Sequence, residues 1–424
     1  MLYEHWRAVA REHRCETALY DLASEQRWTF AQLNQISEQE PVAFDSAVVF
    51  PQGKSAAFVF AVLQAWRHGR IVCPLEAGQV APLSMTGLPS GYAQVKMTSA
   101  TTGVSRAIAF TGPQLMADAR NIVATMGLRP DWPNLGLISL AHSYGFSNLV
   151  LPLLLHGVPL ILGESPLPET LRQAAAATKF LTLPGVPALW RAWLDAGVIP
   201  RHVKLAISAG APLPLSLETT IFANSGIKVH NFYGGSECGG IAFDRSPAPR
   251  ADPACVGTPM ENVEVLVGTD GCLEVRGEAV GQTYFPEPNE RLQAGRFHTS
   301  DLAEIIGGSI FLRGRATDQI NVAGRKISPG PIERVLASHP AVAECLVFGV
   351  PSEMAERGEE IVACVVGRSP LSAPDLKEFL STQLPSWQIP REWWFIPSLQ
   401  PDHRGKLSRS EWRTRFLARE HGDV

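Results

Sequence analysis

The sequence lacks a long uninterrupted apolar segment. Its most apolar stretch, residues 149–162, is broken by two prolines, a histidine and a glycine. A membrane-spanning helix needs about 20 consecutive apolar residues. We therefore expect no membrane span and predict a buried strand and loop for this stretch. The amino terminus is polar and charged from its first residues, so no signal peptide is expected.

The sequence also lacks an excess of charge of one sign. It contains 37 lysines and arginines against 41 aspartates and glutamates, a formal net charge of −4, without a long basic block. Proteins that bind nucleic acid neutralise its phosphates with clustered lysine and arginine. No nucleic-acid partner is therefore expected.

Cysteine is scarce and scattered. The seven cysteines are odd in number, and no pair has the spacing of metal ligands. This usage favours reduced thiols in a cytoplasmic protein. Cys238 alone lies near a candidate site, and we predict a packed thiol there.

Short apolar segments alternate with helical patterns along most of the chain. Residues 47–50, 135–139, 180–183 and 205–208 are examples of such segments. The alternation predicts an α/β fold whose mainly parallel sheets are flanked by helices. Residues 256–280 differ, because alternating valines and a turn glycine predict a hairpin-rich, β-barrel-like region.

A change of pattern divides the chain. A length of 424 residues exceeds one ordinary hydrophobic core. A second, smaller α/β pattern begins near Arg315, where a short helix at residues 331–336 precedes apolar strands. We predict a large N-terminal domain over residues 1–314 and a small C-terminal domain over residues 315–424.

Residues 98–106 combine hydroxyl side chains, a glycine and an arginine. Hydroxyls and backbone N–H groups donate hydrogen bonds to phosphate oxygens, glycine lets the backbone approach, and a cation offsets charge. The loop is predicted to hold a polyphosphate; a turn without a ligand is the alternative. Thr111 is expected to cap a helix with Leu115, Ala119 and Ile122 on one face.

Four further motifs follow this loop in a fixed order. They are Asn-Phe-Tyr-Gly-Gly-Ser-Glu at 231–237, His-Thr-Ser-Asp at 298–301, Gly-Arg-Ala-Thr-Asp-Gln-Ile-Asn at 314–321 and Gly-Lys-Leu-Ser-Arg at 405–409. Together the five motifs resemble the adenylate-forming (AMP-binding) superfamily, which includes acyl- and aryl-CoA synthetases, luciferases and the adenylation domains of peptide synthetases. The resemblance runs from about Trp28 to Arg409 and implies a mobile C-terminal domain. The segment before the phosphate loop is shorter than in relatives, so the N-terminal half is expected to be abbreviated.

The resemblance implies where ATP would bind. Contacts to the β- and γ-phosphates are expected from Thr98, Ser99, Thr101, Thr102, Gly103 and Arg106. Contacts to the adenine and ribose are expected from Gly210, Ala211, Pro212, Asn231, Phe232, Tyr233, Asp301 and Arg315. Tyr233 would lie against the base, and Asp301 would accept both ribose hydroxyls. Ser105-Arg106 replaces the family's Pro-Lys, which keeps the positive charge.

The resemblance also assigns the catalytic residues. Ser236 would contact the α-phosphate or the adenylate, and Glu237 would bind Mg²⁺. A helix-capping carboxylate is the alternative for Glu237. Lys406 would bridge the attacking carboxylate and the α-phosphate.

The acceptor side is implied by the segment after the predicted hinge, Thr317. Gly324, Arg325 and Lys326 form a loop that would admit the thiol arm of CoA or of a carrier-protein phosphopantetheine. The two acceptors present the same arm, so the sequence leaves both open.

The substrate pocket is expected around His142, Ser143, Gly234 and Gly235. No acid stands between residues 139 and 163, so an α-amino acid would bury an unpaired ammonium group. A carboxylic acid without an α-amine is therefore predicted, and both fatty and aryl acids fit an apolar pocket. A packed histidine is the alternative for His142.

The resemblance thus predicts an ATP-dependent acid–thiol ligase that forms an acyl-AMP and then a thioester. One alternative is an adenylating enzyme that passes its acyl group to an amine or another nucleophile. A second is a non-catalytic nucleotide-binding scaffold. A homodimer is a further possibility, because an abbreviated N-terminal half would leave apolar surface for a second subunit to cover.

Overall fold

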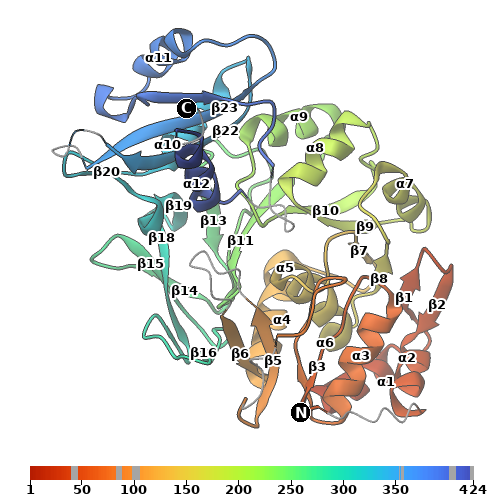
Figure 1. Cartoon of the computed structure of the whole chain (residues 1–424). Helices are drawn as coiled ribbons and strands as arrows, with labels where there is room; N and C mark the ends of the chain where they lie inside the picture. The colour runs from red at the N-terminus through yellow and green to blue at the C-terminus, as the bar shows by residue number, and fades with distance from the viewer. Residues whose placement is uncertain are drawn as a thin grey trace. The chain divides into compact units, whose positions relative to one another are not determined.

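The computed structural model describes residues 1–39, 46–82, 88–97, 106–352, 354, 358–400 and 407–420. They form two compact units (Figure 1). The first unit comprises Met1–Leu266, Glu274–Thr299 and Ile305–Ile310, and the second comprises Val267–Leu273, Ser300–Glu304 and Phe311–Val424. The predicted domain boundary at residues 314–315 stays a prediction.

The larger sheet of the first unit has the strand order β13-β12-β11-β10-β9-β7-β8-β1-β2. Its strands are β13 (Cys255–Pro259), β12 (Gly239–Phe243), β11 (Val229–Gly235), β10 (Val203–Ser208), β9 (Leu181–Gly185), β7 (Asn134–Gly136), β8 (Leu160–Leu162), β1 (Thr17–Asp21) and β2 (Gln26–Thr29). Neighbours from β11 to β1 are parallel, whereas β2, β12 and β13 pair antiparallel. This confirms the predicted α/β architecture.

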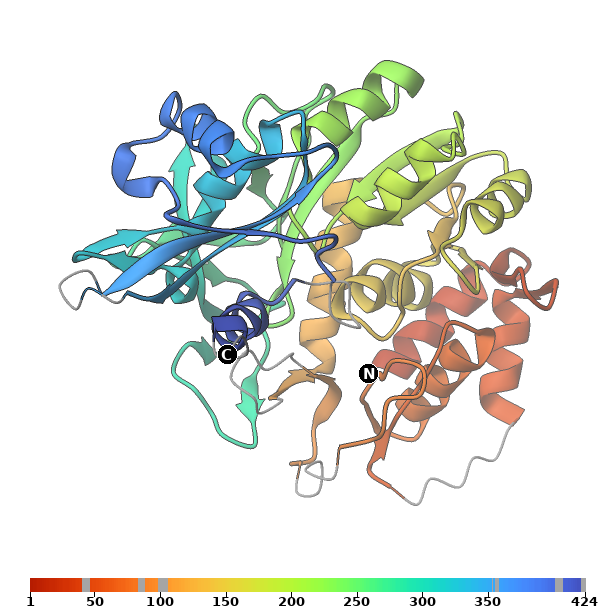
Figure 2. The same ribbon diagram turned by 45° about the horizontal axis from the view of Figure 1, so that its top comes forward.

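Three helices pack on this sheet: α7 (Pro168–Ala176), α8 (Pro187–Asp195) and α9 (Leu215–Ser225). Both views show α8 and α9 side by side (Figure 2). Trp190 and Trp193 of α8 are fully buried in the shared core, with their ring centroids 5.3 Å apart. Three more helices belong to the N-terminal part: α1 (Leu2–Glu12), α2 (Phe30–Gln39) and α3 (Ala56–Arg67).

The smaller sheet of the first unit has the order β16-β6-β5-β4-β3. Its strands are β16 (Thr283–Phe285), β6 (Ala107–Thr111), β5 (Tyr92–Met97), β4 (Ile71–Val72) and β3 (Val48–Val49). Lys96 of β5 and Tyr284 of β16 both pair with Ile108 of β6 in antiparallel register. Directly paired residues point to the same face of a sheet, so these three side chains form one row.

Helix α4 (Gly112–Met126) follows β6 directly. Thr111 and Gln114 form a capping box at its start, and the predicted apolar face is buried. Residues 149–156 were predicted to be strand and loop, and that prediction is wrong. They belong to the π-helix η2 (Phe146–Val150) and to α6 (Leu151–His156); the predicted strand is present only at β8.

Four strands have residues in both units: β14 (Glu264–Val267), β15 (Cys272–Arg276), β18 (Arg296–Ile306) and β19 (Ser309–Arg315). A two-residue strand, β17 (Leu292–Gln293), pairs antiparallel with β18. These elements form the predicted hairpin-rich region and extend it beyond residue 280.

The second unit is a small α/β fold. The strands β22 (Val342–Pro351), β23 (Glu359–Gly367) and β24 (Glu392–Phe395) form one sheet, and β20 (Ile320–Val322) pairs with β21 (Arg325–Ile327). Helices α10 (Pro329–Ser338) and α11 (Ala373–Ser381) contribute to one apolar core, and α12 (Arg409–Glu420) contributes to another. No helix among the described residues of either unit has the length and apolarity to cross a membrane.

Candidate functional site

The turn from Ser236 to Cys238 joins strands β11 and β12. Close backbone approach requires the glycines beside it: a Cβ on Gly234 would lie 2.6 Å from the carbonyl oxygen of Gly239. Gly239 also has a φ of 69°, in the region that favours glycine. Glu237 therefore lies in a tight turn between two strands, and the alternative of a helix-capping carboxylate is wrong.

Glu237 is held by strand β16. The Tyr284 hydroxyl donates a hydrogen bond to Glu237 Oε1 across 3.0 Å, and the Gly281 N–H donates one to the Glu237 carbonyl across 2.7 Å. Burial and the adjacent carboxylate raise the pKa of Tyr284, so the phenol stays protonated and keeps donating. Sequence reasoning missed Tyr284, because its strand is short and carries no motif.

Arg106 lies beside this group. Its guanidinium carbon is 5.9 Å from the Tyr284 ring centroid. The structure therefore brings together Arg106, from the edge of the phosphate loop, and Glu237, from the motif at 231–237. The remaining phosphate-loop residues predicted to bind, Thr98, Ser99, Thr101, Thr102 and Gly103, lie outside the described residues.

The chemistry of this turn fits Mg²⁺. The turn offers a carboxylate and the Ser236 hydroxyl, both half-buried, and Mg²⁺ prefers oxygen ligands. Cys238, the one soft donor in the turn, is buried, and burial together with Glu237 raises the pKa of its thiol. Cys238 is thus a packed thiol, as predicted.

The residues predicted to contact adenine lie at the ends of β10 and β11. Ser208 pairs in register with Asn231, so residues 209–212 leave β10 beside the second segment. Gly210, Ala211 and Pro212 are exposed, and Gly210 has a φ of 84°. The structure therefore brings together the two segments that the sequence assigned to adenine.

Three side chains of β11 differ in burial. Asn231 and Phe232 are buried and Tyr233 is half-buried. Phe232 packs against the Tyr144 ring with centroids 5.8 Å apart, so its side chain belongs to the core. Within this strand, Tyr233 is the aromatic residue that retains exposed surface.

A buried network of four charged side chains supports these segments. Lys228 donates to Glu218 and to Asp244, and Arg250 Nε donates to Glu218 Oε2 across 2.9 Å. All four residues are at most 8% exposed. Arg250 Nη2 also donates to the carbonyl oxygen of Leu213 across 2.7 Å. The network therefore anchors the far end of the loop that begins at Gly210.

Lys228 and Ser246 stabilise the Asp244 carboxylate. Burial alone would raise the pKa of Asp244, but hydrogen bonds from Lys228 and Ser246 bring it below its ordinary value. The sequence motifs do not include this network, because its residues come from segments that carry no recognisable pattern.

Residues 139–142 form a loop, called the substrate loop below, that precedes α5 (Ser143–Gly145). His142 and Ser143 are half-buried, and His142 Nδ1 accepts the Tyr144 N–H across 3.4 Å. The hydroxyl of Ser139 donates to Glu76 Oε1 across 2.7 Å. An acid therefore does contact this loop, although it comes from outside residues 139–163.

Glu76 has a cationic neighbour. Burial lowers the pKa of Lys54, whereas the charge of Glu76 opposes that shift, and Lys54 Nζ donates to the Leu137 carbonyl oxygen across 3.2 Å. Lys54 thus lies within electrostatic reach of Glu76, and the preference for substrates without an α-amine stays a prediction.

The second unit carries the residues predicted to contact ribose. Arg315 Nε and Asp301 Oδ1 form an ion pair at 2.8 Å, between strands β19 and β18. Thr317 lies in the 3-10 helix η3 (Ala316–Asp318). The roles of Asp301 and Arg315 in nucleotide binding, and of Thr317 as a hinge, stay predictions.

The predicted acceptor loop is the β20–β21 hairpin. Gly324 has a φ of 80°, and a Cβ placed there would meet no atom within 4 Å. Arg325 lies over the Trp387 ring, 5.3 Å from its centroid, and Lys326 is exposed. Lys406 lies outside the described residues.

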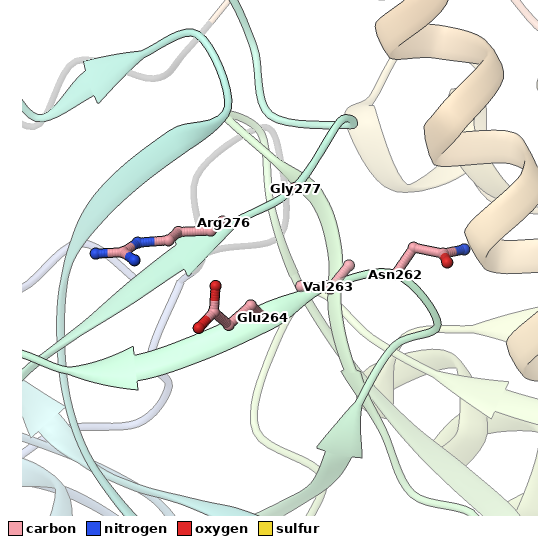
Figure 3. Close-up of a pocket in the computed structure, with 5 residues that line it drawn as sticks. All are labelled: Asn262, Val263, Glu264, Arg276 and Gly277. Carbon is pink, nitrogen blue, oxygen red and sulfur yellow. The ribbon is translucent and has the colours of Figure 1, made fainter.

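A surface pocket of about 420 Å³ lies elsewhere in the first unit. It is lined by Asn262, Val263, Glu264, Arg276 and Gly277 (Figure 3). The Asn262 side chain points away from those of Glu264 and Arg276. None of the predicted site residues that the structure describes lines this pocket, so it is not the candidate site.

Known protein families match two segments of this chain. The AMP-binding enzyme family matches residues 89–289, and the AMP-binding enzyme C-terminal domain matches residues 331–406. A 4-coumarate–CoA ligase-like protein of Oryza sativa subsp. japonica is 28% identical, over 83% of this chain and 67% of its own. A probable 2-succinylbenzoate–CoA ligase of Mycobacterium tuberculosis is 26% identical, over 87% of this chain and 98% of its own.

Solved structures share the fold. ATP-bound MatB from Rhodopseudomonas palustris superposes with a TM-score of 0.84 and 19% identity, covering 98% of this chain and 99% of that one. The o-succinylbenzoate CoA synthetase MenE from Bacillus subtilis, in complex with the acyl-adenylate intermediate OSB-AMP, superposes with a TM-score of 0.80 and 20% identity. The match covers 96% of this chain and 97% of that one.

Proposed function

Because this chain belongs to the AMP-binding, adenylate-forming enzyme family, we propose that it is an ATP-dependent acid–CoA ligase. The family and the enzyme class predicted from the five motifs are confirmed. The substrates that follow are ATP, a carboxylic acid and CoA. The observation that carries the proposal for this site is the convergence of Arg106, Glu237 and Tyr284 on one turn.

The first half-reaction joins two anions. The carboxylate oxygen of the acid attacks the α-phosphorus of ATP, the bond from phosphorus to the bridging oxygen breaks, and pyrophosphate leaves. Repulsion between the anions is the main barrier, so cations and hydrogen-bond donors must be positioned in advance. Mg²⁺ on Glu237 would neutralise phosphate oxygens. Arg106 would hold the departing pyrophosphate, and Lys406 would bring the carboxylate to the α-phosphate.

The second half-reaction transfers the acyl group. The thiol sulfur attacks the acyl carbon, AMP leaves, and a thioester forms. The exposed hairpin around Gly324 supports this step, because glycine has no side chain and no atom lies within 4 Å of the position of a Cβ, which leaves the backbone open to a narrow pantetheine arm. CoA is favoured over a carrier protein, since the relatives compared above are named as CoA ligases.

The acid is proposed to lack an α-amine. Glu76 is the acid that contacts the substrate loop, and it accepts a hydrogen bond from Ser139. The segment from residue 139 to residue 163 itself contains no aspartate or glutamate that could pair with an ammonium group near His142. Fatty and aryl acids both satisfy this condition.

Acid-dependent exchange of labelled pyrophosphate into ATP tests the proposal. Panels of fatty, aryl, dicarboxylic and α-amino acids are offered to the wild type, to Glu237→Gln and to Glu287→Gln, an exposed control in the same unit. We expect exchange with at least one non-amino acid and its loss in Glu237→Gln alone. Exchange with no acid would favour the nucleotide-binding scaffold. Exchange without a thioester from CoA or carrier protein would favour an amine acceptor.

A further inference from the structure

Lys96 is a buried cation that the proposed chemistry does not use. It lies on β5 and is 5% exposed. Its Nζ is 3.5 Å from Ser147 Oγ and 4.4 Å from the Phe110 ring centroid. A buried charge is costly unless it is paired and hydrogen-bonded, so Lys96 requires a nearby anion.

Asp118 of helix α4 supplies that anion. It is 3% exposed, and Ser147 Oγ donates to its Oδ2 across 2.6 Å. Ser147 thereby accepts from the lysine and donates to the aspartate, which links the two charges through one hydroxyl. The negative charge of Asp118 favours protonated Lys96 and opposes the effect of burial, which lowers the pKa of that amine.

Asp118 also contacts the backbone of β12, the strand that follows Glu237. Its Oδ1 accepts the Gly240 N–H across 3.4 Å, and a Cβ on Gly239 would lie 2.1 Å from the same oxygen. The carboxylate is thus packed directly against the backbone that closes the Ser236–Cys238 turn. Moving Asp118 would move this turn.

Lys96 belongs to the smaller sheet of the first unit, whereas the Ser236–Cys238 turn belongs to the larger one. Lys96, Ile108 and Tyr284 form the row across β5, β6 and β16. Tyr284 bonds Glu237, and a Cβ on Gly281 would meet both Ile108 Cγ2 and the Glu237 carbonyl oxygen. Each of the three side chains in the row is therefore linked to the turn. Tyr284 bonds the Glu237 side chain, Ile108 lies next to Gly281 beside the Glu237 carbonyl, and Lys96 experiences the charge of Glu237.

We propose that Lys96 and Asp118 are positioning residues for Glu237: two buried, oppositely charged side chains, bridged by Ser147, that fix the turn and set the electrostatic potential at the cation Glu237 binds. This inference rests on the proposed function, since it assumes that Glu237 holds the metal. The pair is neutral as a whole. Removing either charge alone would therefore change the potential at Glu237 in opposite directions.

The test measures metal dependence without turnover. ATP binding to the full chain is followed by calorimetry over a series of Mg²⁺ concentrations, with no acid present. Asp118→Asn removes a negative charge near Glu237 and is expected to raise the half-saturating Mg²⁺ concentration by about tenfold, the effect of one unit charge at the effective dielectric constant of a protein. Lys96→Met is expected to lower it, and the double variant to return it to within about twofold of the wild type.

Matched controls keep the test specific. Lys204 lies 4.4 Å over the Phe180 ring, as Lys96 does over Phe110, but is exposed. Lys204→Met and the exposed Asp195→Asn are expected to leave the metal dependence unchanged. Thermal unfolding of each variant is recorded alongside, because a purely structural role would lower the unfolding temperature without moving the metal dependence.

A half-saturating Mg²⁺ concentration that is the same in both single variants as in the wild type would overturn the proposal. Where Asp118→Asn does not fold, Asp118→Glu serves instead. It keeps the charge but presses a methylene group against Gly239, so an unchanged metal dependence overturns the proposal there too. Failure of the proposed function is distinguishable, because Glu237→Gln would then leave the metal dependence of the wild type unaltered.

Discussion

Tyr284 and Glu237, 47 residues apart in the chain, meet through a 3.0 Å hydrogen bond from the phenol to the carboxylate. The bond joins the smaller sheet of the first unit to the turn that ends β11. It orients one oxygen of the proposed metal ligand. The metal site would therefore depend on a strand that contains no motif residue.

Tyr284→Phe removes this donor and keeps the ring. A hydrogen bond to a charged group contributes about 1.5–3 kcal/mol, so we expect the Mg²⁺ concentration for half-maximal pyrophosphate exchange to rise about tenfold. Tyr3→Phe, which removes a 3.0 Å bond to Ser37 far from the turn, is the control. Equal metal titrations for the two variants would contradict the role of Tyr284.

Asp301→Asn should weaken ATP binding and leave the order of preferred acids unchanged. The two predicted charge-assisted hydrogen bonds to ribose would contribute roughly 3–6 kcal/mol before water recovers part of it. Glu304→Gln breaks a comparable 2.8 Å ion pair with Arg313 on the same two strands and provides a matched control. An ATP affinity equal to the wild type in Asp301→Asn would remove Asp301 from the nucleotide site.

Lys406→Ala should abolish most acyl-AMP formation while sparing thioester formation from pre-made acyl-AMP. The family resemblance implies a role for this lysine in the first half-reaction only, because a rotation of the C-terminal domain would exchange the residues that serve each step. Single-turnover rates of the two half-reactions are compared with those of Lys377→Ala, on α11. Equal losses in both half-reactions would refute the assignment.

Glu218→Gln should destabilise the first unit strongly. Glu218 is fully buried and accepts from both Lys228 and Arg250. Removing one member of a buried ionic network costs about 3–5 kcal/mol, because the remaining charges lose their compensation. Urea unfolding should show this loss, whereas Glu169→Gln, in an exposed pair with Arg172, should change stability by under about 1 kcal/mol.

The stability of the fold should fall in mild acid partly through His230. Burial lowers the pKa of His230 below its ordinary value of 6.5, although its hydrogen bond to the Asp244 carbonyl opposes this. The unfolded chain therefore binds a proton at a higher pH than the folded chain. Stability from this group is complete above pH 6.5 and declines below it by at most about 1.4 kcal/mol per pH unit.

Urea midpoints at pH 7.5 and 5.5 measure this slope. His230→Gln should show a smaller difference between the two pH values than the wild type. The exposed His68 supplies the control substitution His68→Gln, which should keep the full difference. A wild-type slope in His230→Gln would contradict the prediction.

Local patterns predicted the elements that local forces determine. The helix after Thr111 followed from its cap and its apolar spacing, and the strands at 180–183 and 205–208 from short apolar runs. Residues 149–156 failed for a physical reason: a short continuous apolar run has no period, so a buried helix and a buried strand look alike.

The residues of the candidate site also fall into two groups, those that the sequence predicted and those that it did not. Motif order identified Glu237 and Tyr233, and the family is confirmed; their individual roles stay predictions. Tyr284, Lys96 and Arg250 were not found, because each acts through a contact between distant segments. Register across β5, β6 and β16 aligns Lys96 with Tyr284, and register is a property of the folded sheet.

The hydrogen bond from Arg250 to the Leu213 carbonyl constrains the number of residues in the loop that starts at Gly210, but not which side chains the loop carries. The acceptor is a backbone atom, so it survives any exchange of side chains at residues 210–212. Inserting or deleting a residue shifts that carbonyl and takes away the acceptor of a buried guanidinium N–H group. Redesign of this loop, for a different nucleotide or acid, therefore has freedom in sequence and almost none in chain length.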